Sequence, residues 1–290
     1  MWRRQQDKAL RPRVGLALSG GAARGIAHVG VLRVLQAHGI PVDVVAGTSA
    51  GALVGGALAA GMPLSEIERL GRSLRWRDMG RMTISRLGIQ SNARMQELIE
   101  ERFPVKRFEE LPTPFAAVAT DLLTGMPVML SGEGSVALAI RASCAIPGWY
   151  VPVTDELGRQ LIDGGVSANI PTVEARSLGA EVVIAVDVNS EGAKFLSAPT
   201  SLVGVLFQSM MVLQRTALTH QLQAASVVIS PKVGHIRWDE MARADELIRL
   251  GEEAALDQIE NIRRLLEPAP EKPPARWYQF RRRSTSQTLR

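Results

Sequence analysis

The chain has 290 residues, of which 46% are hydrophobic and 22% are charged, a composition typical of a soluble globular protein with a full core. Its formal net charge of +5 is unevenly spread: residues 1–13 carry +4, residues 276–290 carry +5, and the residues between them carry −4. A nucleic-acid-binding domain carries its basic stripe on the folded surface, so this distribution argues against nucleic acid as a partner.

Cysteine and metal-ligand residues indicate the expected environment. The single cysteine, Cys144, cannot form an intrachain disulfide, which fits a reducing compartment such as the cytoplasm. No group of Cys, His, Asp and Glu has zinc-ligand spacing, so we expect no metal, and no motif indicates another cofactor. Residues 1–13 contain no apolar segment, so we expect no secretory signal.

The first part of the chain alternates strands and helices. In chain order, the pattern predicts a buried strand at Val14–Leu18, a glycine-rich loop at 19–25, a helix at 26–38, a strand at 42–46, and a second helix beginning near Ser49. Strand and helix alternating through short joints predict a mostly parallel sheet with helices on both faces. The fold class is therefore α/β.

One uncharged stretch, residues 44–65, resembles a membrane helix in one respect. It has glycines at positions 47, 51 and 55, the four-residue spacing of small residues in paired membrane helices. The stretch consists mostly of Gly, Ala, Ser and Thr, with few large apolar side chains. We therefore interpret it as a strand, a tight turn and a buried helix of a soluble protein.

The rest of the chain divides into three regions. Residues 62–110 are more polar, arginine-rich and helical in pattern, and we interpret them as a cap inserted into the α/β core. After the cap we expect a long helix at 200–224 and strands at 115–120, 127–130, 160–162, 182–188 and 227–230. Residues 267–274, made almost entirely of Pro, Glu, Ala and Lys, end the predicted fold.

The glycine-rich loop predicts an anion site. It contains Gly20, Gly21, Ala22, Arg24 and Gly25. Glycines let a loop expose successive N–H groups, and a helix N-terminus favours negative charge. A cation there costs about 0.3–1 kcal/mol, so a bound anion would explain Arg24, as would an arginine side chain that turns away into solvent.

A dinucleotide-binding fingerprint is the competing interpretation of this loop. It requires an acidic residue about 20 residues on, at the end of the second strand. Asp43 lies at the beginning of that strand, and Gly47, Thr48 and Ser49 occupy its end. The nucleotide interpretation therefore fails on geometry.

The second motif has the form G-x-S-x-G. It runs from Gly47 to Gly51 with Ser49 at its centre, after a predicted strand and before a predicted helix, which is the context of a nucleophile elbow. A helix N-cap serine in a tight turn is the alternative. Gly21 and Ser49 are 28 residues apart, about one βαβ unit (roughly 30 residues), so we expect the loop's amides to lie beside the serine.

A serine nucleophile needs a base. Asp163 ends an apolar strand and precedes Gly164 and Gly165, which places it where open α/β sheets bind ligands. An aspartate that opens a glycine turn is the alternative. A Ser-Asp-His triad could instead use His220 or His235, although neither has a supporting motif.

The remaining histidines have other interpretations. We expect His28, which lies inside an apolar helix, to be a packed core residue. His38 lies at a predicted helix C-terminus beside Gly39, where the helix dipole favours a cation.

The three motifs together resemble those of the patatin-like phospholipase family. The matching segments are Ser19–Gly25, Gly47–Gly51 and Asp163–Gly165, in this order, and Arg141–Pro147 also looks like that family's helix-to-proline segment. The resemblance spans roughly residues 14–190. Three motifs in the right order are far more specific than any one of them.

This resemblance implies a three-layer α/β/α fold. It also implies a Ser49–Asp163 catalytic dyad without histidine, an oxyanion hole formed by the amides around Gly21 and Ala22, and Arg24 beside it. The implied reaction is hydrolysis of a lipid or other carboxylic ester through an acyl-enzyme on Ser49. The alternatives are a hydrolase with a histidine-containing triad and a non-catalytic regulatory or lipid-binding protein on the same scaffold.

The expected domains are a basic extension at 1–13, a catalytic domain at 14–266 with the cap insertion at about 62–110, and a Pro-rich linker with a basic tail at 267–290. In the tail, residues 276–283 interleave arginines with aromatic rings, a pattern suited to an anionic membrane surface. A solvated disordered tail is the alternative. Arginines of the cap could also face phospholipid headgroups, or its helices could simply pack on the core.

Overall fold

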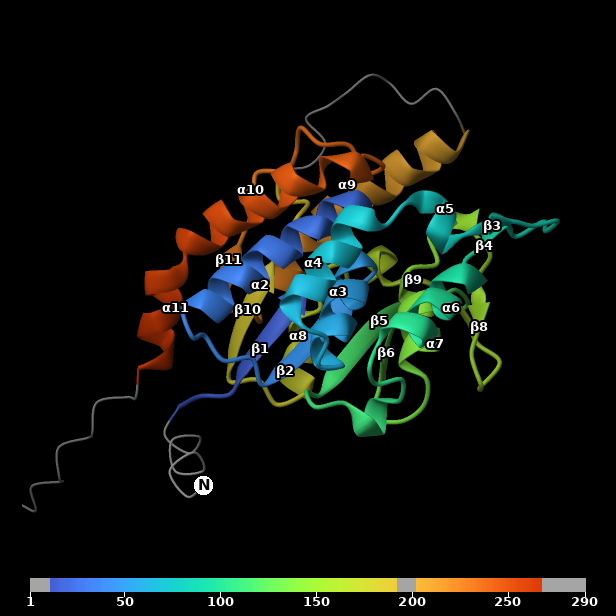
Figure 1. The fold of residues 1–290 in the computed structure, drawn as a ribbon. Helices are drawn as coiled ribbons and strands as arrows, with labels where there is room; N and C mark the ends of the chain where they lie inside the picture. Colours follow the sequence, from blue (N-terminus) through green and yellow to red (C-terminus); the bar gives the residue numbers. More distant parts are fainter. Residues whose placement is uncertain (1–10, 192–201, 268–290) are drawn as a thin grey trace, which may run out of the picture.

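The computed structural model describes residues 11–191 and 202–267, and its central feature is a sheet of eight strands (Figure 1). The strands follow the order β11-β10-β1-β2-β5-β9-β8, and β6 also pairs with β5. Five are parallel to one another. The bounds are β1 Val14–Leu18, β2 Val44–Thr48, β5 Phe115–Asp121, β6 Pro127–Ser131, β8 Val153–Thr154, β9 Gln160–Asp163, β10 Val182–Val186 and β11 Val227–Ile229.

Helices cover both faces of this sheet. Their bounds are η1 Ala22–Ile26, α2 Ala27–Ala37, α3 Ala50–Ala59, α4 Leu64–Ser73, α5 Trp76–Met79, α6 Ala93–Arg102, η2 Phe108–Glu110, α7 Val136–Ser143, η3 Gly164–Val166, α8 Thr172–Ser177, α9 Leu202–Leu222, η4 Met241–Arg243, α10 Ala244–Leu256 and α11 Ile259–Leu266.

The alternation of side chains along each strand decides which helices pack on which face. Leu16 and Leu18 of β1 belong to a large apolar cluster with α2, α3 and α10. Ala17, between them, belongs to a smaller cluster with residues of α8 and the end of α9. Because successive side chains of a strand point to opposite faces, one five-residue strand contributes to both cores, and the result is a three-layer α/β/α arrangement.

Strands β2 and β9 meet end to end along one edge of β5. Ala119 and Thr120 of β5 pair with both β6 and β9, so β9 must lie on the edge of β5 opposite β6. By the same reasoning β2 lies on that edge too, because residues 116–118 pair with both β2 and β6. The register places Thr48 opposite Val118 and Asp163 opposite the next residue. The last residues of β2 and β9 therefore lie next to each other along this edge of β5.

Residues 62–110 form helices and one hairpin. α4 and α6 have the helical character expected of residues 62–110, and α4 packs against α2 and α3. The hairpin of β3 (Arg81–Met82) and β4 (Gly88–Ser91) was not predicted. It is completed by β7 (Gly148–Tyr150), with Gln90 opposite Tyr150. The local sequence could not indicate a strand whose partner lies about sixty residues away.

The sequence-based boundaries are confirmed with small shifts. The second strand was expected at 42–46 and runs from Val44 to Thr48. Asp43, directly before it, donates its amide to the Val14 carbonyl oxygen, while its carboxylate accepts the Val14 amide and pairs with Arg11. The uncharged stretch 44–65 forms β2 and α3, as expected, and no described helix has the length and hydropathy needed to span a bilayer. The basic N-terminal residues 1–10 and the tail 268–290 lie outside the described residues.

Candidate active site

Ser49 occupies the turn between β2 and α3. Its backbone has φ 53° and ψ −121°, a region that L-residues rarely adopt and that costs of order 1–3 kcal/mol. A Cβ on Gly47 would lie 2.4 Å from the carbonyl oxygen of Gly51, and a Cβ on Gly51 would lie 2.1 Å from that of Leu18. The turn therefore needs both glycines of the motif because the backbone packs too closely for side chains.

A serine from a distant helix holds the backbone of this turn. The Ser49 amide donates to Ser143 Oγ over 2.8 Å, and Ser143 Oγ donates to the Val118 carbonyl oxygen over 2.5 Å. Ser143 is the last residue of α7 and is fully buried. The sequence motifs did not identify Ser143 individually, although it lies in the helix-to-proline segment that resembles the family.

Asp163 contacts the Ser49 side chain directly. Ser49 Oγ donates to Asp163 Oδ2 over 2.7 Å, and the Gly165 amide donates to Asp163 Oδ1 over 2.8 Å. Burial raises the pKa of Asp163 to about 6, and the hydrogen bonds from Ser49 and Gly165 lower it in part. A Cβ on Gly164 would lie 2.0 Å from the Val118 carbonyl oxygen, so the glycine lets β9 end tightly against β5.

The glycine-rich loop lies beside these two residues, and most of its amides are already used. The amides of Gly20, Ala23 and Arg24 donate to backbone carbonyls. Within the described part of the chain, the amides of Gly21 and Ala22 have no acceptor. Ala22 has φ 52°, a left-handed conformation that ends the loop and begins η1. Only these two amides of the loop's first half remain available to a ligand.

The Arg24 side chain does not lie where the resemblance implied. It is fully buried, donates through Nε to the Ile236 carbonyl oxygen over 2.8 Å, and donates through Nη1 to Asn189 Oδ1 over 3.2 Å. Burial lowers its pKa to about 10, partly offset by the charge of Glu191. Arg24 therefore ties the loop to the segment after β11 and lines neither hollow beside Ser49.

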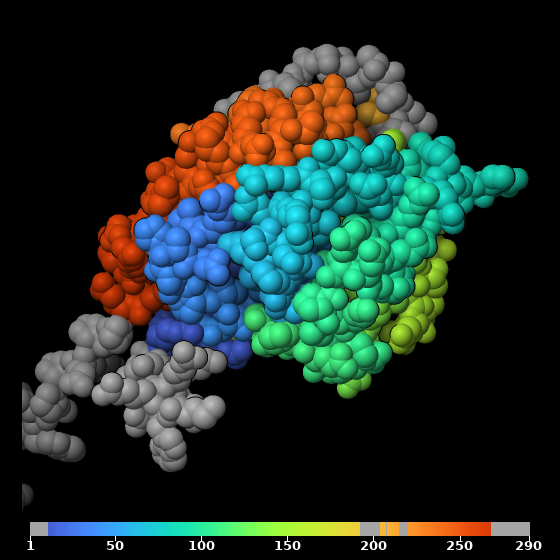
Figure 2. All heavy atoms as spheres, viewed as in Figure 1, coloured from blue at the N-terminus to red at the C-terminus, as the bar shows by residue number. Residues whose placement is uncertain are grey.

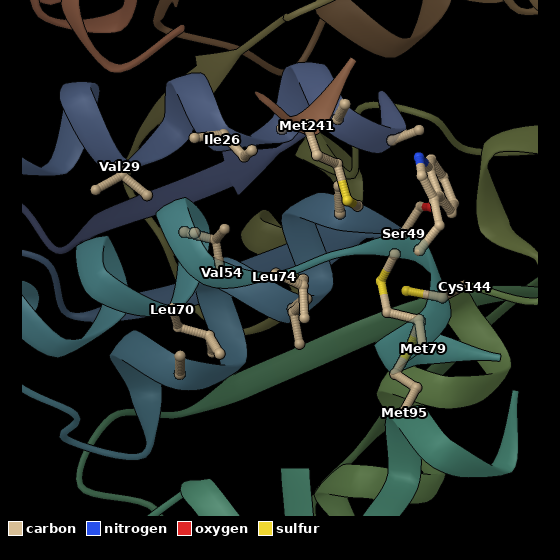
Figure 3. Close-up of a pocket in the computed structure, with 18 of the residues that line it drawn as sticks. Ile26, Val29, Ser49, Val54, Leu70, Leu74, Met79, Met95, Cys144 and Met241 are labelled. Carbon is tan, nitrogen blue, oxygen red and sulfur yellow. The ribbon is translucent and has the colours of Figure 1, made fainter. Parts of the chain in front are cut away.

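Two hollows of different character open beside Ser49. One is an apolar cavity of about 80 Å³ that runs from Ser49 between α2, α3 and α4, with Val29 and Leu70 distant from the serine (Figure 3). The other is smaller, about 20 Å³, and contains polar groups. Its lining includes Gly20, Gly21, Ala22, Asp163, Asn169, Asn189 and Gln214. An ester whose carbonyl carbon lay at Ser49 would have room for one apolar and one polar substituent.

Asn169 is a candidate site residue that sequence reasoning missed. It is 4% exposed, it lines the smaller hollow, and its Oδ1 is buried with no hydrogen-bond partner among the described residues. Buried amide groups are normally paired, so an unsatisfied one beside a nucleophile suggests a substrate contact. No motif pointed to Asn169, since only the fold brings it against the glycine-rich loop.

None of the four histidines, all of which are described, contacts Ser49 or Asp163. His28 is buried as expected, with Nε2 2.8 Å from the Ser19 carbonyl oxygen, and burial lowers its pKa to about 4. His38 contacts Arg263, His235 contacts Glu246, and His220 is exposed on α9. Across residues 11–191 and 202–267, no group of three or more His, Cys, Asp and Glu is arranged to hold a metal.

Comparisons with known proteins identify a family and several relatives of this chain. Residues 16–176 match the family described as Patatin-like phospholipase. An uncharacterized NTE family protein of Mycobacterium bovis is 40% identical over 185 residues, 63% of this chain and 51% of that protein. Patatin-like phospholipase domain-containing protein 7 of Rattus norvegicus is 37% identical over 186 residues, 61% of this chain but only 14% of that protein.

A solved structure shares the fold. The crystal structure of VipD from Legionella pneumophila has a TM-score of 0.51 and 14% sequence identity, covering 87% of this chain and 67% of that one. At this identity the likeness supports the three-layer architecture alone.

The buried Asp163 carboxylate is expected to lower the stability of the folded protein at neutral pH. Because the pKa of Asp163 is raised in the folded state, the native protein binds the proton more tightly than the unfolded chain, and ionisation at neutral pH destabilises the fold. Asp163→Asn removes the charge: its Oδ1 can still accept from the Gly165 amide, and its Nδ2 can donate to Ser49 Oγ, which reverses the direction of that bond. We expect the free energy of unfolding to rise by about 1–3 kcal/mol at pH 7.5, with the gain shrinking as pH falls through 6 toward 4, where the native carboxyl is protonated.

Urea denaturation of both proteins at pH 7.5 and pH 4.5 measures this difference. Glu133→Gln, the same carboxyl-to-amide change at an exposed position, is the control and should change stability by less than about 0.5 kcal/mol. A less stable Asp163→Asn protein at pH 7.5 would contradict the prediction.

Proposed function

Since the chain belongs to the patatin-like phospholipase family, we propose that it is a serine-dependent lipid acyl-hydrolase with Ser49 as nucleophile and Asp163 as base. The observation that carries the proposal is the 2.7 Å hydrogen bond from Ser49 Oγ to Asp163 Oδ2, in a site where no histidine reaches either group. Family membership supports an ester-hydrolysing activity, and the dyad is our specific assignment.

The proposed reaction has two halves. Asp163 accepts the proton of Ser49 Oγ as that oxygen attacks the carbonyl carbon of the ester. The amides of Gly21 and Ala22, with the N-terminus of α3, stabilise the negative charge on the carbonyl oxygen. The carbon–oxygen bond to the alcohol then breaks, the alcohol takes the proton from Asp163, and the acyl group remains on Ser49. Water attacks the acyl-enzyme by the same route, which restores the serine.

The electrostatics favour a carboxylate in this role. An ordinary carboxylate is too weak a base to activate a serine, and a base is most effective when its pKa lies near the working pH. Desolvation raises the pKa of Asp163 to about 6, which makes it a stronger base while leaving it ionised at neutral pH. Burial thus gives the carboxylate part of the basicity that a histidine would provide.

The shape of the site favours an ester with a fatty acyl chain. The apolar cavity begins at Ser49 and is lined almost entirely by hydrocarbon and sulfur side chains. Seven of its lining residues come from residues 62–110: Ile67, Leu70, Gly71, Leu74, Trp76, Met79 and Met95. We propose that residues 62–110 act as a cap that closes the acyl cavity over the core of the catalytic domain.

The proposal includes a compartment and a membrane contact. The single cysteine, Cys144, is buried and free, as expected for a reducing compartment, so we propose a cytoplasmic enzyme that meets its lipid at a membrane surface. The headgroup side of the ester would lie in the smaller hollow, where Asn169 and Gln214 offer carboxamide groups.

The dyad makes a direct kinetic prediction. Ser49→Ala and Asp163→Asn should each lower kcat/KM for a short-chain nitrophenyl ester by at least about 10³-fold, because each removes a member of one catalytic unit. The control is His235→Ala, which should change kcat/KM by less than about twofold because His235 lies against Glu246. Full activity without either dyad group, or loss of activity without His235, would contradict the dyad.

The apolar cavity predicts a dependence on acyl chain length. Val54 of α3 lines the cavity (Figure 3), so Val54→Phe should fill part of it and lower kcat/KM for a nitrophenyl decanoate about tenfold or more. Hydrolysis of the acetate, which needs no deep cavity, should change less than about twofold. Val173→Phe, on the exposed surface of α8, is the matched control. Equal effects of Val54→Phe on both esters would contradict this placement of the acyl chain.

A further inference from the structure

The β3–β4 hairpin stands out from the body of the protein. Figure 1 shows it as a narrow extension beyond α5, and the space-filling view shows it projecting from the molecular surface (Figure 2). Arg81 lies opposite Ser91 and Met82 opposite Gln90, and residues 83–87 form the connection. The tip of the hairpin therefore extends into solvent.

Large apolar side chains are concentrated at this tip. Met82 is 69% exposed, Ile84 107% and Leu87 57%. Isolated exposed apolar residues are common on protein surfaces, but here three fall within six residues on a projecting element. Moving these side chains out of water would lower the free energy. They do not pack into the core of the protein, so another apolar environment would have to receive them.

The charge around the tip has one sign. Residues 79–96 contain three arginines and no acid. Arg81 and Arg86 are exposed and form no ion pair within the described residues. The arginines of α4 differ, because Arg69 pairs with Glu66 and Arg72 pairs with Glu68. Arg81 and Arg86 are therefore available to contact lipid headgroups, whereas Arg69 and Arg72 are already paired with acids of α4.

A second exposed apolar turn lacks the arginines of the hairpin. The turn between β5 and β6 exposes Leu122, Leu123 and Met126. It begins at Asp121, and residues 111–140 contain no lysine or arginine. Apolar exposure alone therefore occurs elsewhere on the surface, whereas apolar exposure combined with unpaired cations is found at the hairpin.

The base of the hairpin is continuous with the acyl cavity. Trp76 and Met79 of α5, directly before the hairpin, line the cavity. So does Tyr150 of β7, which lies opposite Gln90 of β4. A partner that binds the hairpin would consequently lie near α5 and β7, which line the cavity beside Ser49.

We propose that the β3–β4 hairpin anchors the protein to an anionic lipid bilayer. Met82, Ile84 and Leu87 enter the boundary between headgroups and acyl chains, while Arg81 and Arg86 contact lipid phosphates. The inference rests on the proposed function, since a lipid substrate is what would require such an anchor. This contact differs from the one expected of the basic tail, because apolar side chains of a single hairpin enter the bilayer.

A site-specific probe tests the insertion directly. In the full chain carrying Ser49→Ala, which prevents turnover, Ile84→Cys is labelled with an environment-sensitive fluorophore; native Cys144 is buried and stays unlabelled. Vesicles containing phosphatidylglycerol should produce a blue shift and about a twofold or greater rise in emission, and phosphatidylcholine vesicles a smaller change. Leu256→Cys, at the end of α10, is the matched exposed control and should not respond.

A double substitution tests the contribution to affinity. Ile84→Ser/Leu87→Ser should weaken binding to phosphatidylglycerol vesicles about tenfold or more in sedimentation, and Leu256→Ser/Leu265→Ser should leave it within about twofold. No blue shift at position 84, or unchanged binding by the hairpin variant, would overturn the proposal and leave a protein partner as the occupant of this surface.

Hydrolysis of a water-soluble nitrophenyl ester separates the two proposals. The hairpin variant on the active Ser49 background should hydrolyse it at the parent rate, because the hairpin tip does not line either hollow beside the serine. If the parent protein hydrolyses the soluble ester but the hairpin shows no vesicle contact, the anchor alone is wrong. If position 84 inserts and no ester is hydrolysed, the proposed function alone is wrong.

Discussion

The structure depends on the end-to-end meeting of β2 and β9 along one edge of β5. Thr48 lies opposite Val118 and Asp163 opposite Ala119. The parallel strand β2 and the antiparallel strand β9 therefore run toward each other and end opposite adjacent residues of β5. The residue after β2 is the serine, and the residue that ends β9 is the acid. Their 2.7 Å contact is thus a result of sheet topology, and the tight turns that follow both strands preserve it.

This arrangement stores free energy at the site. Ser49 has a positive φ, Asp163 is a buried carboxylate with a raised pKa, and Asn169 has an unpaired buried oxygen. Each feature disfavours folding by an amount of order 1–3 kcal/mol. The two apolar clusters and the glycines that let backbones approach closely offset this cost. Strain of this kind is expected where a structure holds groups ready for a reaction.

Much of the fold and of the site could be predicted from the sequence, because the information was local. Short apolar strands and glycine turns predicted the α/β class, and three motifs in order predicted Ser49 and Asp163 as candidate site residues, which the structure places in hydrogen-bond contact. The features that were missed depend on distant contacts. Ser143 becomes important only when α7 packs beneath the elbow, Asn169 only when its loop meets Gly20, and the β3–β4 hairpin only because β7 pairs with it. Arg24 was expected beside the oxyanion hole from the resemblance, or turned into solvent; its guanidinium is instead buried and donates to the carbonyl oxygens of Gly234 and Ile236, which only the fold brings near it.

The most direct test of the carboxylate as base is the pH dependence of the rate at which a fluorophosphonate reacts with Ser49. With the pKa of Asp163 near 6, the rate should fall about tenfold per pH unit below that value. A protein with His38, His220 and His235 all changed to Gln should show the same profile, and Asp163→Asn should react at least about 10³-fold more slowly. An unchanged rate in Asp163→Asn, or loss of the acidic limb in the histidine variant, would contradict the account.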